Sequence, residues 1–476
     1  MKPLLEEIEV QNFKSFKNTK IKFRSFNVVI GPNGSGKSNL VDLFKFLKKA
    51  IGEKLEPYTP YLEWWNYRNL VWGGREDLPI KITLKFNVEY YKVNYYVAFI
   101  KIEDEFKVLE EILEIPGYTK IQRKGNLVTI INNPEIIDKH YEKLRDELNE
   151  LMKKMSGGMK FLDQVKELSV NELINLLKKP QQFMMFPSEK PRLRSFDLFE
   201  ISRLTMRNKL ALPVMSFVIP LEKDAMLEIQ VMYVRDEKPE LKLSGLILPY
   251  VEELEEKPLR RKIIDIKKWC SSIIALKPIN VDEVKIPRSP SGMRSDRLSD
   301  KAENLVLILH NLYLKRDGLP ERIKQALKIM FPDIQIGFDQ MRDGRLFLKI
   351  LQYNHELNPP CISDGLYKVL IILTALELNP SVLIIDEIEN SLHARPTLEY
   401  LIDELKNSGL TVVLTTHSPV IVDMVEPQDL IFVEMTPDGS VFKKIEEPEK
   451  AKAMLRRLGI TQSEAWLYGE LKLRKA

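Results

Sequence analysis

The sequence is poor in cysteine and histidine and has no long hydrophobic run. Only Cys270 and Cys361 occur among 476 residues, far apart, which predicts a reducing cytoplasm and no disulfide framework. None of the five histidines clusters with cysteines at metal-ligand spacing, so we expect no structural zinc site. The longest nearly apolar run, residues 369–376, is far shorter than the about 20 residues of a membrane span. Glutamates near the first residue stand where a signal peptide would be apolar. We therefore predict a cytoplasmic protein without a membrane partner.

An excess of charge of one sign is also missing. The chain has 72 Lys and Arg against 68 Asp and Glu, a formal net charge of +4, so its bulk charge argues neither for nor against a nucleic-acid partner. The length allows two or three domains.

The most informative segment that is present is Gly-Pro-Asn-Gly-Ser-Gly-Lys-Ser at residues 31–38, which has the spacing of a phosphate-binding loop. The apolar run 26–30 suits a buried parallel strand, and residues 39–47 have apolar side chains at helical spacing. A strand, a glycine loop and a helix present backbone N–H groups and a helix N-terminus to phosphate oxygens. We expect Lys37 to reach the β- and γ-phosphates of ATP and Ser38 to ligate Mg²⁺. An ordinary turn between strand and helix is the alternative.

A second apolar strand, predicted at residues 381–385, ends in Asp386 and Glu387. Ligands of open α/β sheets bind at the carboxyl ends of strands. We predict that Asp386 holds Mg²⁺ through water and that Glu387 orients the attacking water. A third strand, 410–415, precedes His417, which is placed to meet the γ-phosphate; a histidine with only a structural role is the alternative.

Upstream of the carboxylates, Ser363-Asp364-Gly365 precedes an apolar helical stretch at residues 366–378. A serine cap followed by glycine exposes N–H groups at a helix start. By itself this tripeptide would be an ordinary helix cap, and its position before the Asp-Glu strand gives it weight.

The order of these four motifs resembles an ABC-type ATPase head. The start Gln-Asn-Phe-Lys-Ser-Phe (11–16), followed by the phosphate loop and Asn39, resembles the SMC/RecF group of DNA-handling ATPases. Two further segments are most similar to the AAA15/AAA21-type ATPases, which include the ATPase half of OLD-family nucleases. These segments are Ser-Asp-Gly and Asp-Glu-Ile-Glu-Asn-Ser-Leu-His (386–393). The resemblance covers about residues 1–130 and 300–476 and implies an α/β P-loop NTPase fold of the ABC/SMC-head type.

This resemblance also implies roles for residues. In such heads two subunits enclose two ATP molecules, and the signature helix of one subunit caps the γ-phosphate held by the other. Ser363 and Gly365 would then act on the partner's nucleotide, residues 391–393 would form the dimer contact, and Lys14 would approach the nucleotide. The nucleotide-binding loop would comprise Asn33, Gly34, Ser35, Gly36, Lys37, Ser38 and Asn39.

The chain departs from the family pattern at two positions. Asp364 stands where many members have glycine, and a carboxylate facing a γ-phosphate would be repulsive, so we expect it to point away or to weaken the cap. No glutamine occurs between Ser38 and Gln122, so the Mg²⁺-sensing glutamine is unassigned, and residues 72–75 occupy its region.

The predicted organisation has three parts. Residues 1–132 form a β-rich N-terminal lobe, 133–300 a mixed helical and β insertion, and 301–476 the C-terminal lobe. A seam of apolar residues from Ile137 to Met155 is too short for an SMC arm and predicts a short helical hairpin or a core-covering helix.

Basic residues of the insertion form three clusters. They are Lys190, Arg192, Arg194, Arg203, Arg207 and Lys209; Arg260, Arg261, Lys262, Lys267 and Lys268; and Arg288, Arg294 and Arg297. Such clusters are either solvated faces or phosphate contacts. OLD-like nucleases carry a C-terminal nuclease domain with an Asp-x-Asp pair, and this chain has no such pair, so we expect no DNA cleavage by the chain alone.

The leading hypothesis is an ATP-gated homodimeric switch that acts on DNA in repair or defence and works with a separate nuclease or effector. The alternatives are a nucleotide-binding regulator of a protein partner without nucleic acid, and a transporter-type ATPase.

Overall fold

The structure is a computed structural model, and it describes little of the predicted insertion. The described residues are 3–53, 58–88, 91–116, 119–124, 127–132, 181–184, 214–221, 225–232, 266–290, 297–392, 394–471 and 473–475. The predicted seam between Ile137 and Met155 lies outside them, as do the first basic cluster, residues 260–262 and Arg294.

The chain divides into two compact units. Unit 1 comprises Met1–Pro3, Ile8–Gln11 and Lys54–Lys268, and unit 2 comprises Leu4–Glu7, Asn12–Glu53 and Trp269–Ala476. Strand β1 (Leu4–Phe13) therefore contributes residues to both units. Every motif of the predicted nucleotide site belongs to unit 2.

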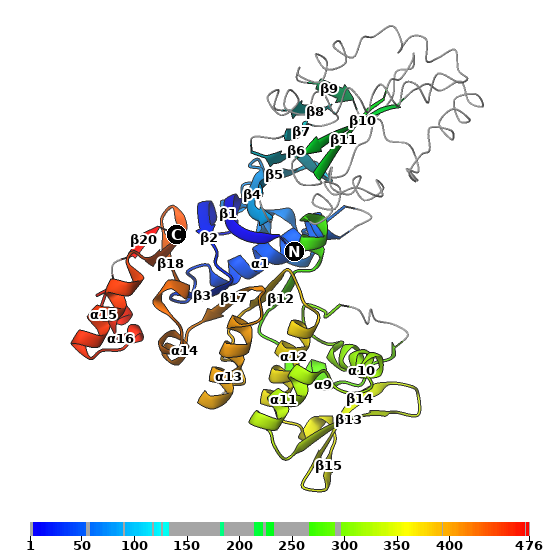
Figure 1. Cartoon of the computed structure of the whole chain (residues 1–476), viewed down its shortest axis with the longest axis vertical. Helices are drawn as coiled ribbons and strands as arrows, with labels where there is room; N and C mark the ends of the chain where they lie inside the picture. The colour runs from blue at the N-terminus through cyan, green and yellow to red at the C-terminus, as the bar shows by residue number, and fades with distance from the viewer. Residues whose placement is uncertain are drawn as a thin grey trace. The chain divides into compact units, whose positions relative to one another are not determined.

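A seven-stranded sheet forms the centre of unit 2, in the order β12-β16-β17-β3-β18-β19-β20 (Figure 1). The first five strands in this order pair in parallel, and the last three pair antiparallel. Their bounds are β12 Ile274–Leu276, β16 Val382–Ile385, β17 Thr411–Thr416, β3 Phe26–Ile30, β18 Leu430–Thr436, β19 Gly439–Ile445 and β20 Leu473–Lys475. The predicted strands before the glycine loop, the carboxylates and His417 are thus confirmed.

Helices cover both faces of this sheet. Helix α1 (Lys37–Leu47) lies on one side, and α12 (Asp364–Glu377) and α13 (Arg395–Lys406) lie on the other (Figure 1). Burial on both faces explains why β3, β16 and β17 are apolar without alternation, since all their residues are buried. The remaining helices of unit 2 are α9 (Val281–Lys285), α10 (Leu305–Lys315), α11 (Glu321–Met330), α14 (Pro419–Met424), α15 (Pro448–Leu458) and α16 (Gln462–Leu467).

Two smaller β elements complete unit 2. Strands β13 (Ile334–Gln340), β14 (Leu346–Gln352) and β15 (His355–Leu357) form a three-stranded antiparallel sheet. Strand β2 (Phe16–Lys22) lies beside β19, where the Thr19 hydroxyl donates to the Ser440 carbonyl at 3.1 Å. Near the end of the chain, β20 pairs its backbone with β19.

Unit 1 contains an antiparallel sheet in which consecutive strands pair. Its strands are β4 (Ile80–Val88), β5 (Tyr91–Ile102), β6 (Glu105–Ile115), β7 (Thr119–Lys124), β8 (Leu127–Asn132) and β9 (Gln181–Met184). A hairpin of β10 (Val214–Leu221) and β11 (Ala225–Met232) also belongs to this unit. The alternation of apolar and polar residues at 81–87, 90–102 and 127–131 predicts three of these strands to within one residue at each end.

Among the described residues, we find no helix with the length and apolar character needed to span a bilayer.

Candidate nucleotide-binding site

The parallel pairing of three strands brings the predicted motifs to one edge of the sheet. Strand β17 lies between β16 and β3, with Leu414 opposite Ile385 and Thr416 opposite Ile30. The residues that follow these strands are the carboxylates at 386–387, His417 and the glycine loop. Because the three strands run in the same direction, all three motifs leave the sheet at its carboxyl edge, where ligands of open α/β folds bind.

The glycine loop has almost no room for side chains at two of its positions. A Cβ atom on Gly36 would lie 2.2 Å from the Ser440 Oγ, and Gly36 has a φ of +109° that favours glycine. At Gly31 a Cβ atom would lie 2.2 Å from the Val433 carbonyl oxygen. Strands β18 and β19 therefore hold the loop from behind, while Pro32, Asn33 and Gly34 are exposed.

Three serines fix the loop to its neighbours. The Ser440 hydroxyl lies 2.7 Å from the Ser35 carbonyl oxygen and 2.7 Å from the Ser15 hydroxyl. The Asn39 side-chain amide donates to the same Ser15 hydroxyl at 2.7 Å. Because a hydroxyl has one proton, Ser440 donates to the carbonyl and accepts from Ser15. Ser38 is exposed at the start of α1, next to Lys37.

Lys37 is buried and its ammonium group is enclosed by the loop. The Nζ atom donates to the carbonyl oxygens of Gly31 at 2.8 Å and Pro32 at 3.0 Å, and it lies 3.5 Å from the His417 Nδ1. Burial lowers the pKa of Lys37, and the nearby carboxylates of Asp386, Glu387 and Glu389 oppose this shift. The lysine thus lies near both the carboxylates and the histidine, as the sequence predicted for parts of one site.

Thr415 connects the Asp386 carboxylate to the backbone of Glu387 at the end of β16. Its hydroxyl donates to the Asp386 Oδ1 at 2.5 Å and accepts from the Glu387 backbone N–H at 2.9 Å. Asp386 is buried, whereas the Glu387 side chain is half-buried. Glu387 has a φ of +50°, a region that non-glycine residues enter at a cost, and such strain is concentrated at functional sites. The hydrogen bond from its N–H holds the residue in this conformation.

A further carboxylate, Glu389, holds the histidine segment. Its Oε1 accepts from the His417 backbone N–H at 2.7 Å, and its Oε2 accepts from the Thr416 hydroxyl at 2.9 Å. His417 is therefore anchored through its backbone, while its exposed side chain lies beside the Lys37 ammonium. No spacing in the sequence indicated a role for Glu389.

Lys14 lies against the phosphate-loop helix. Its ammonium pairs with the Asp42 carboxylate in α1, and Lys277 pairs with the same carboxylate at 2.5 Å. Lys14 has a φ of +47° at the turn between β1 and β2. Two lysines from distant parts of the chain thus share one buried aspartate on the helix that begins at the phosphate loop.

The signature tripeptide begins α12 as predicted. The Ser363 hydroxyl accepts the Leu366 backbone N–H at 3.4 Å as the helix cap, and both Ser363 and Asp364 are exposed. A Cβ atom on Gly365 would lie 3.1 Å from the Ser391 carbonyl oxygen. The signature therefore lies directly beside the segment that the resemblance assigns to the dimer contact. His393 of that segment lies outside the described residues.

Asp364 does not stand alone at this exposed helix start. Its Oδ1 accepts an ion-paired hydrogen bond from the Lys285 Nζ at 2.7 Å. Lys285 ends α9, which packs against the core through Val281 and Val284. Asp364 departs from the family pattern in the sequence, and in the structure the Lys285 ammonium lies beside its carboxylate.

A buried lysine in α12 also has no role predicted from the sequence. Lys368 is 2% exposed, and burial lowers its pKa to about 8 despite the opposing effect of Glu389, Asp386 and Glu387. One signal was present in the sequence, because Lys368 interrupts an otherwise apolar helical run. A lysine in such a run is almost never buried without carboxylates nearby.

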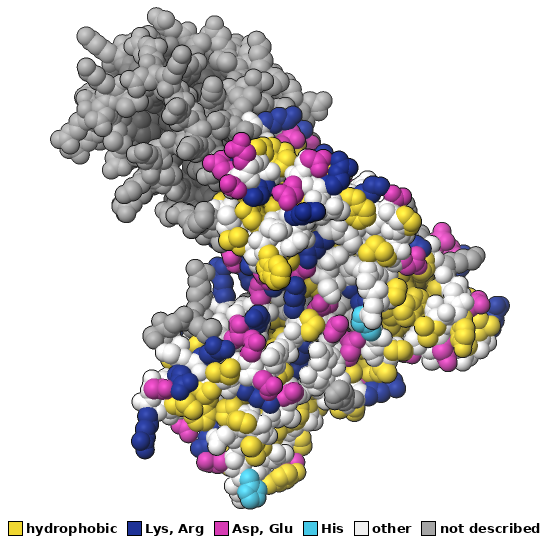
Figure 2. Space-filling model, turned by 180° about the vertical axis from the view of Figure 1, so that it is seen from behind, with side chains coloured by type: hydrophobic (Ala, Val, Ile, Leu, Met, Phe, Trp, Pro, Cys, Tyr) yellow, Lys and Arg dark blue, Asp and Glu magenta, His cyan; other side chains and the backbone are white. Residues whose placement is uncertain are grey.

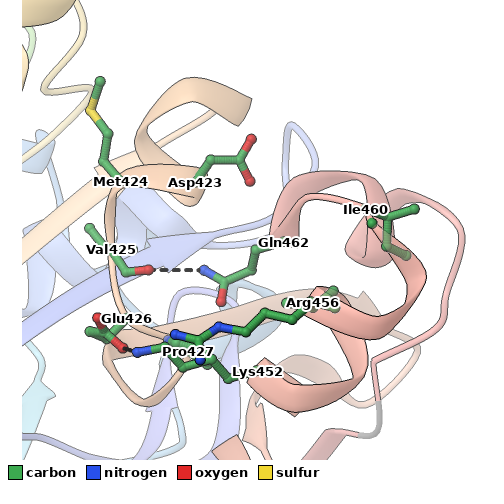
Figure 3. Close-up of a pocket in the computed structure, with 11 residues that line it drawn as sticks. Asp423, Met424, Val425, Glu426, Pro427, Lys452, Arg456, Ile460 and Gln462 are labelled. Atoms are coloured by element: carbon green, nitrogen blue, oxygen red, sulfur yellow. Dashed lines mark hydrogen bonds and ion pairs between the residues drawn. The ribbon is translucent and has the colours of Figure 1, made fainter. Parts of the chain in front are cut away.

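A cavity of about 340 Å³ lies elsewhere in unit 2, where α14 and the following turn meet α15 and α16 (Figure 3). Lys452 closes one side through an ion pair with Glu426 at 2.6 Å, and Gln462 donates to the Val425 carbonyl oxygen at 3.2 Å. None of the predicted site residues lines this cavity.

Two family models match the chain on the two sides of its middle segment. Residues 1–206 match a model described as an AAA ATPase domain. Residues 272–423 match a model described as an AAA domain, whose description also names the AbiEii toxin and a type IV toxin–antitoxin system. The first match contains the phosphate loop, and the second contains the signature, the carboxylates and His417.

Individual relatives are distant. A Helicobacter pylori protein named ATP/GTP phosphatase is 23% identical over 330 residues, covering 66% of this chain and 83% of the relative. The structural maintenance of chromosomes protein 1 of Schizosaccharomyces pombe is 27% identical over 184 residues, 33% of this chain and 14% of the relative. The DNA double-strand break repair Rad50 ATPase of Sulfolobus acidocaldarius is 26% identical over 215 residues, 37% of this chain and 23% of the relative.

Solved structures show only a weak overall likeness. The Smc head domain of Pyrococcus furiosus, solved with an extended coiled coil and the C-terminal domain of ScpA, aligns with 96% of this chain and 99% of its own at 15% identity. The TM-score of 0.41 is too low to carry an argument. The family assignment rests instead on the two family models and on the order of the four motifs. They show that the chain belongs to the SMC/RecF-like group of ABC-type ATPases, of the AAA15/AAA21 type.

Proposed function

We propose that the protein binds and hydrolyses ATP between two copies of the chain and uses the closed dimer as a switch on DNA. The observation that carries the proposal is the meeting of the phosphate loop, Asp386, Glu387 and His417 at one sheet edge. The Helicobacter pylori relative is named ATP/GTP phosphatase, which supports hydrolysis.

Each residue at this edge has a separate role in the proposed binding and hydrolysis of ATP. The backbone N–H groups of the loop and the α1 N-terminus would bind the phosphates, and Lys37 would leave the loop carbonyls for the β- and γ-oxygens. Glu387, half-buried and fixed by Thr415, would orient the attacking water. His417 would contact the γ-phosphate from the neighbouring strand.

The oxygen atoms present at the site suit Mg²⁺. Mg²⁺ prefers hard oxygen ligands and is held by one or two protein groups together with nucleotide phosphates. Ser38 offers a hydroxyl at the start of α1, and Asp386 offers a carboxylate fixed by Thr415. These two residues would hold the ion, which would neutralise charge on the transferred phosphate.

A site of this kind is incomplete in one protomer. Ser363 and Gly365 begin α12 at an exposed position beside Ser391, which supports their action on the nucleotide of a second copy. In the family that the chain belongs to, the signature acts between subunits. We therefore propose a homodimer that forms when ATP binds.

The DNA part of the proposal rests on the relatives and on the basic clusters. The SMC and Rad50 relatives are named for the structural maintenance of chromosomes and for DNA double-strand break repair. On the face shown in Figure 2, basic and acidic side chains of the described residues are interspersed, so that face presents no large basic patch. Most members of the three clusters lie outside the described residues, and DNA contacts are proposed for them from the sequence.

Dimerisation can be tested with Glu387→Gln, which should keep ATP binding and lose about 10²–10⁴-fold in hydrolysis because the water is no longer oriented by a base. Size-exclusion chromatography with light scattering should find a dimer with ATP and a monomer without it. Adding Ser363→Arg should block the dimer by steric and charge conflict. A monomer that persists with ATP bound would overturn the proposed arrangement.

DNA binding can be tested on the same variant by a salt titration of fluorescence anisotropy. Each phosphate contact adds about 0.9 to the slope of log affinity against log salt on duplex DNA. We expect a steeper slope with ATP than without, because dimerisation doubles the basic clusters. Reversing Arg260, Arg261 and Lys262 to glutamate should flatten that slope. No binding at about 50 mM salt in either state would favour the regulator of a protein partner.

A further inference from the structure

The signature of this chain contains a negative charge at the helix start that would face a polyphosphate ligand in the proposed dimer. Asp364 lies between Ser363 and Gly365, and its side chain is 53% exposed. A carboxylate at a phosphate-binding helix start repels the ligand and cancels part of the favourable helix dipole there. A chain that binds ATP with this signature needs a cation close to Asp364.

Lys285 provides that cation from a different element. Its Nζ lies 2.7 Å from the Asp364 Oδ1, and its side chain is only 13% exposed. The same Nζ lies 5.9 Å from the centre of the Tyr367 ring, one turn along α12. A cation over an aromatic face is attracted to it, so the ring also holds the ammonium near the helix start.

Helix α9 is built to present this lysine at a fixed place. Asn280 caps the helix by accepting the Asp282 backbone N–H at 3.2 Å. Val281 and Val284 are buried in the core that also contains Tyr367. Lys285 follows as the last residue of the helix, so its backbone is anchored on the residue before it.

We propose that Lys285 is a positioning residue for ATP-driven dimerisation: it neutralises Asp364 so that the signature can approach the triphosphate bound by a second copy. The inference rests on the proposed function, because it acts in the ATP-bound dimer. Lys285 acts through Asp364, so its effect should vanish when position 364 carries no charge. A role in fold stability alone would show the same dependence in thermal unfolding and would leave the ATP requirement of the folded protein unchanged.

The experiment measures the ATP concentration at which Glu387→Gln protein is half dimeric, by light scattering. Adding Lys285→Met should raise this concentration about tenfold, because an unpaired carboxylate then faces the triphosphate. Adding Asp364→Gly to that variant should return the value to within about threefold of the parent. Lys301→Met is the matched control, since Lys301 pairs loosely with Glu283 of α9 at 3.8 Å and should leave the value unchanged.

Thermal unfolding of each variant separates a loss of fold stability from a loss of positioning. Lys285→Arg keeps the positive charge and should behave like the parent. Equal ATP requirements for the parent and Lys285→Met would overturn this inference alone. Failure of Asp364→Gly to rescue Lys285→Met would also overturn it. If the Glu387→Gln parent does not dimerise with ATP at all, the proposed function fails and this inference fails with it.

Discussion

Lys368 carries a positive charge in a place where charges are costly. It is 2% exposed in the middle of the apolar helix α12. Burial lowers its pKa from 10.5 to about 8, although Glu389, Asp386 and Glu387 favour its charged form. A residue that costs stability and lies near the proposed catalytic carboxylates fits a functional role, which we take to be balancing their charge.

This pKa shift predicts how stability changes with pH. Between about pH 8 and 10.5 the unfolded chain holds more protons at this lysine than the folded chain, so stability rises with pH in that window. Relative to Lys368→Met, the wild-type free energy of unfolding should rise by about 2 kcal/mol between pH 7 and 9.5. Urea denaturation of both proteins at several pH values measures the difference. A difference that does not change with pH would show that Lys368 keeps an ordinary pKa.

Individual residues were predictable where local spacing determines their role. The loop from Asn33 to Asn39, the carboxylates and His417 could be found because each follows a recognisable strand. Thr415 and Lys285 could not, because their function depends on partners 28 and 79 residues away. Lys368 was visible as an interruption of an apolar run, but its burial needed the packed helix.

At the scale of elements, the β18–β19 hairpin supports the phosphate loop. Ser440 of β19 lies 2.7 Å from the Ser35 carbonyl oxygen, although 405 residues separate the two in sequence. The same Ser440 hydroxyl leaves no room for a side chain at Gly36. The hairpin thus determines the shape of the loop as well as extending the sheet.

Removing this support should weaken nucleotide binding. Ser440→Ala deletes the hydrogen bonds to Ser15 and Ser35 and should cost about 1 kcal/mol of stability. Thr436→Ala is a matched control, since its hydroxyl donates to the Gly439 carbonyl at 2.8 Å in the turn of the same hairpin. We expect similar stability losses but weaker ATP binding only for Ser440→Ala, as measured by calorimetric titration. Equal ATP affinities in the two variants would argue against loop support by β19.

The elements themselves were largely predictable. Strands buried on both faces have continuous apolar sequences, which is why β3, β16 and β17 were found. Their order was not predictable from spacing alone, since β3 inserts between β17 and β18 from the other end of the chain. Strand β20 could not be predicted because it is only Leu-Arg-Lys, too short for a recognisable alternation, and it is a strand through its pairing with β19.

At the scale of the whole molecule, the chain combines an ATPase core in unit 2 with a β-rich unit 1. The family models end at residue 206 and resume at 272, so the segment between them has no family match. The predicted division at residues 132 and 300 remains a prediction, since most of the insertion lies outside the described residues.

The central claim is that each ATP site is shared between two copies of the chain. Glu387→Gln cannot hydrolyse ATP but keeps its signature, and Ser363→Arg loses its signature but keeps its base. A heterodimer of the two contains one complete site, formed by the phosphate loop and Glu387 of one protomer and the signature of the other.

Mixing the two inactive proteins and measuring phosphate release tests this claim most directly. The shared site predicts that a 1:1 mixture recovers activity, up to about a quarter of the wild-type value. Random pairing would make half of the dimers mixed, each with one working site, and the conflict caused by the arginine at the other site lowers that fraction. Mixtures of either variant with itself should stay inactive. A mixture no more active than the sum of its separate components would contradict the account.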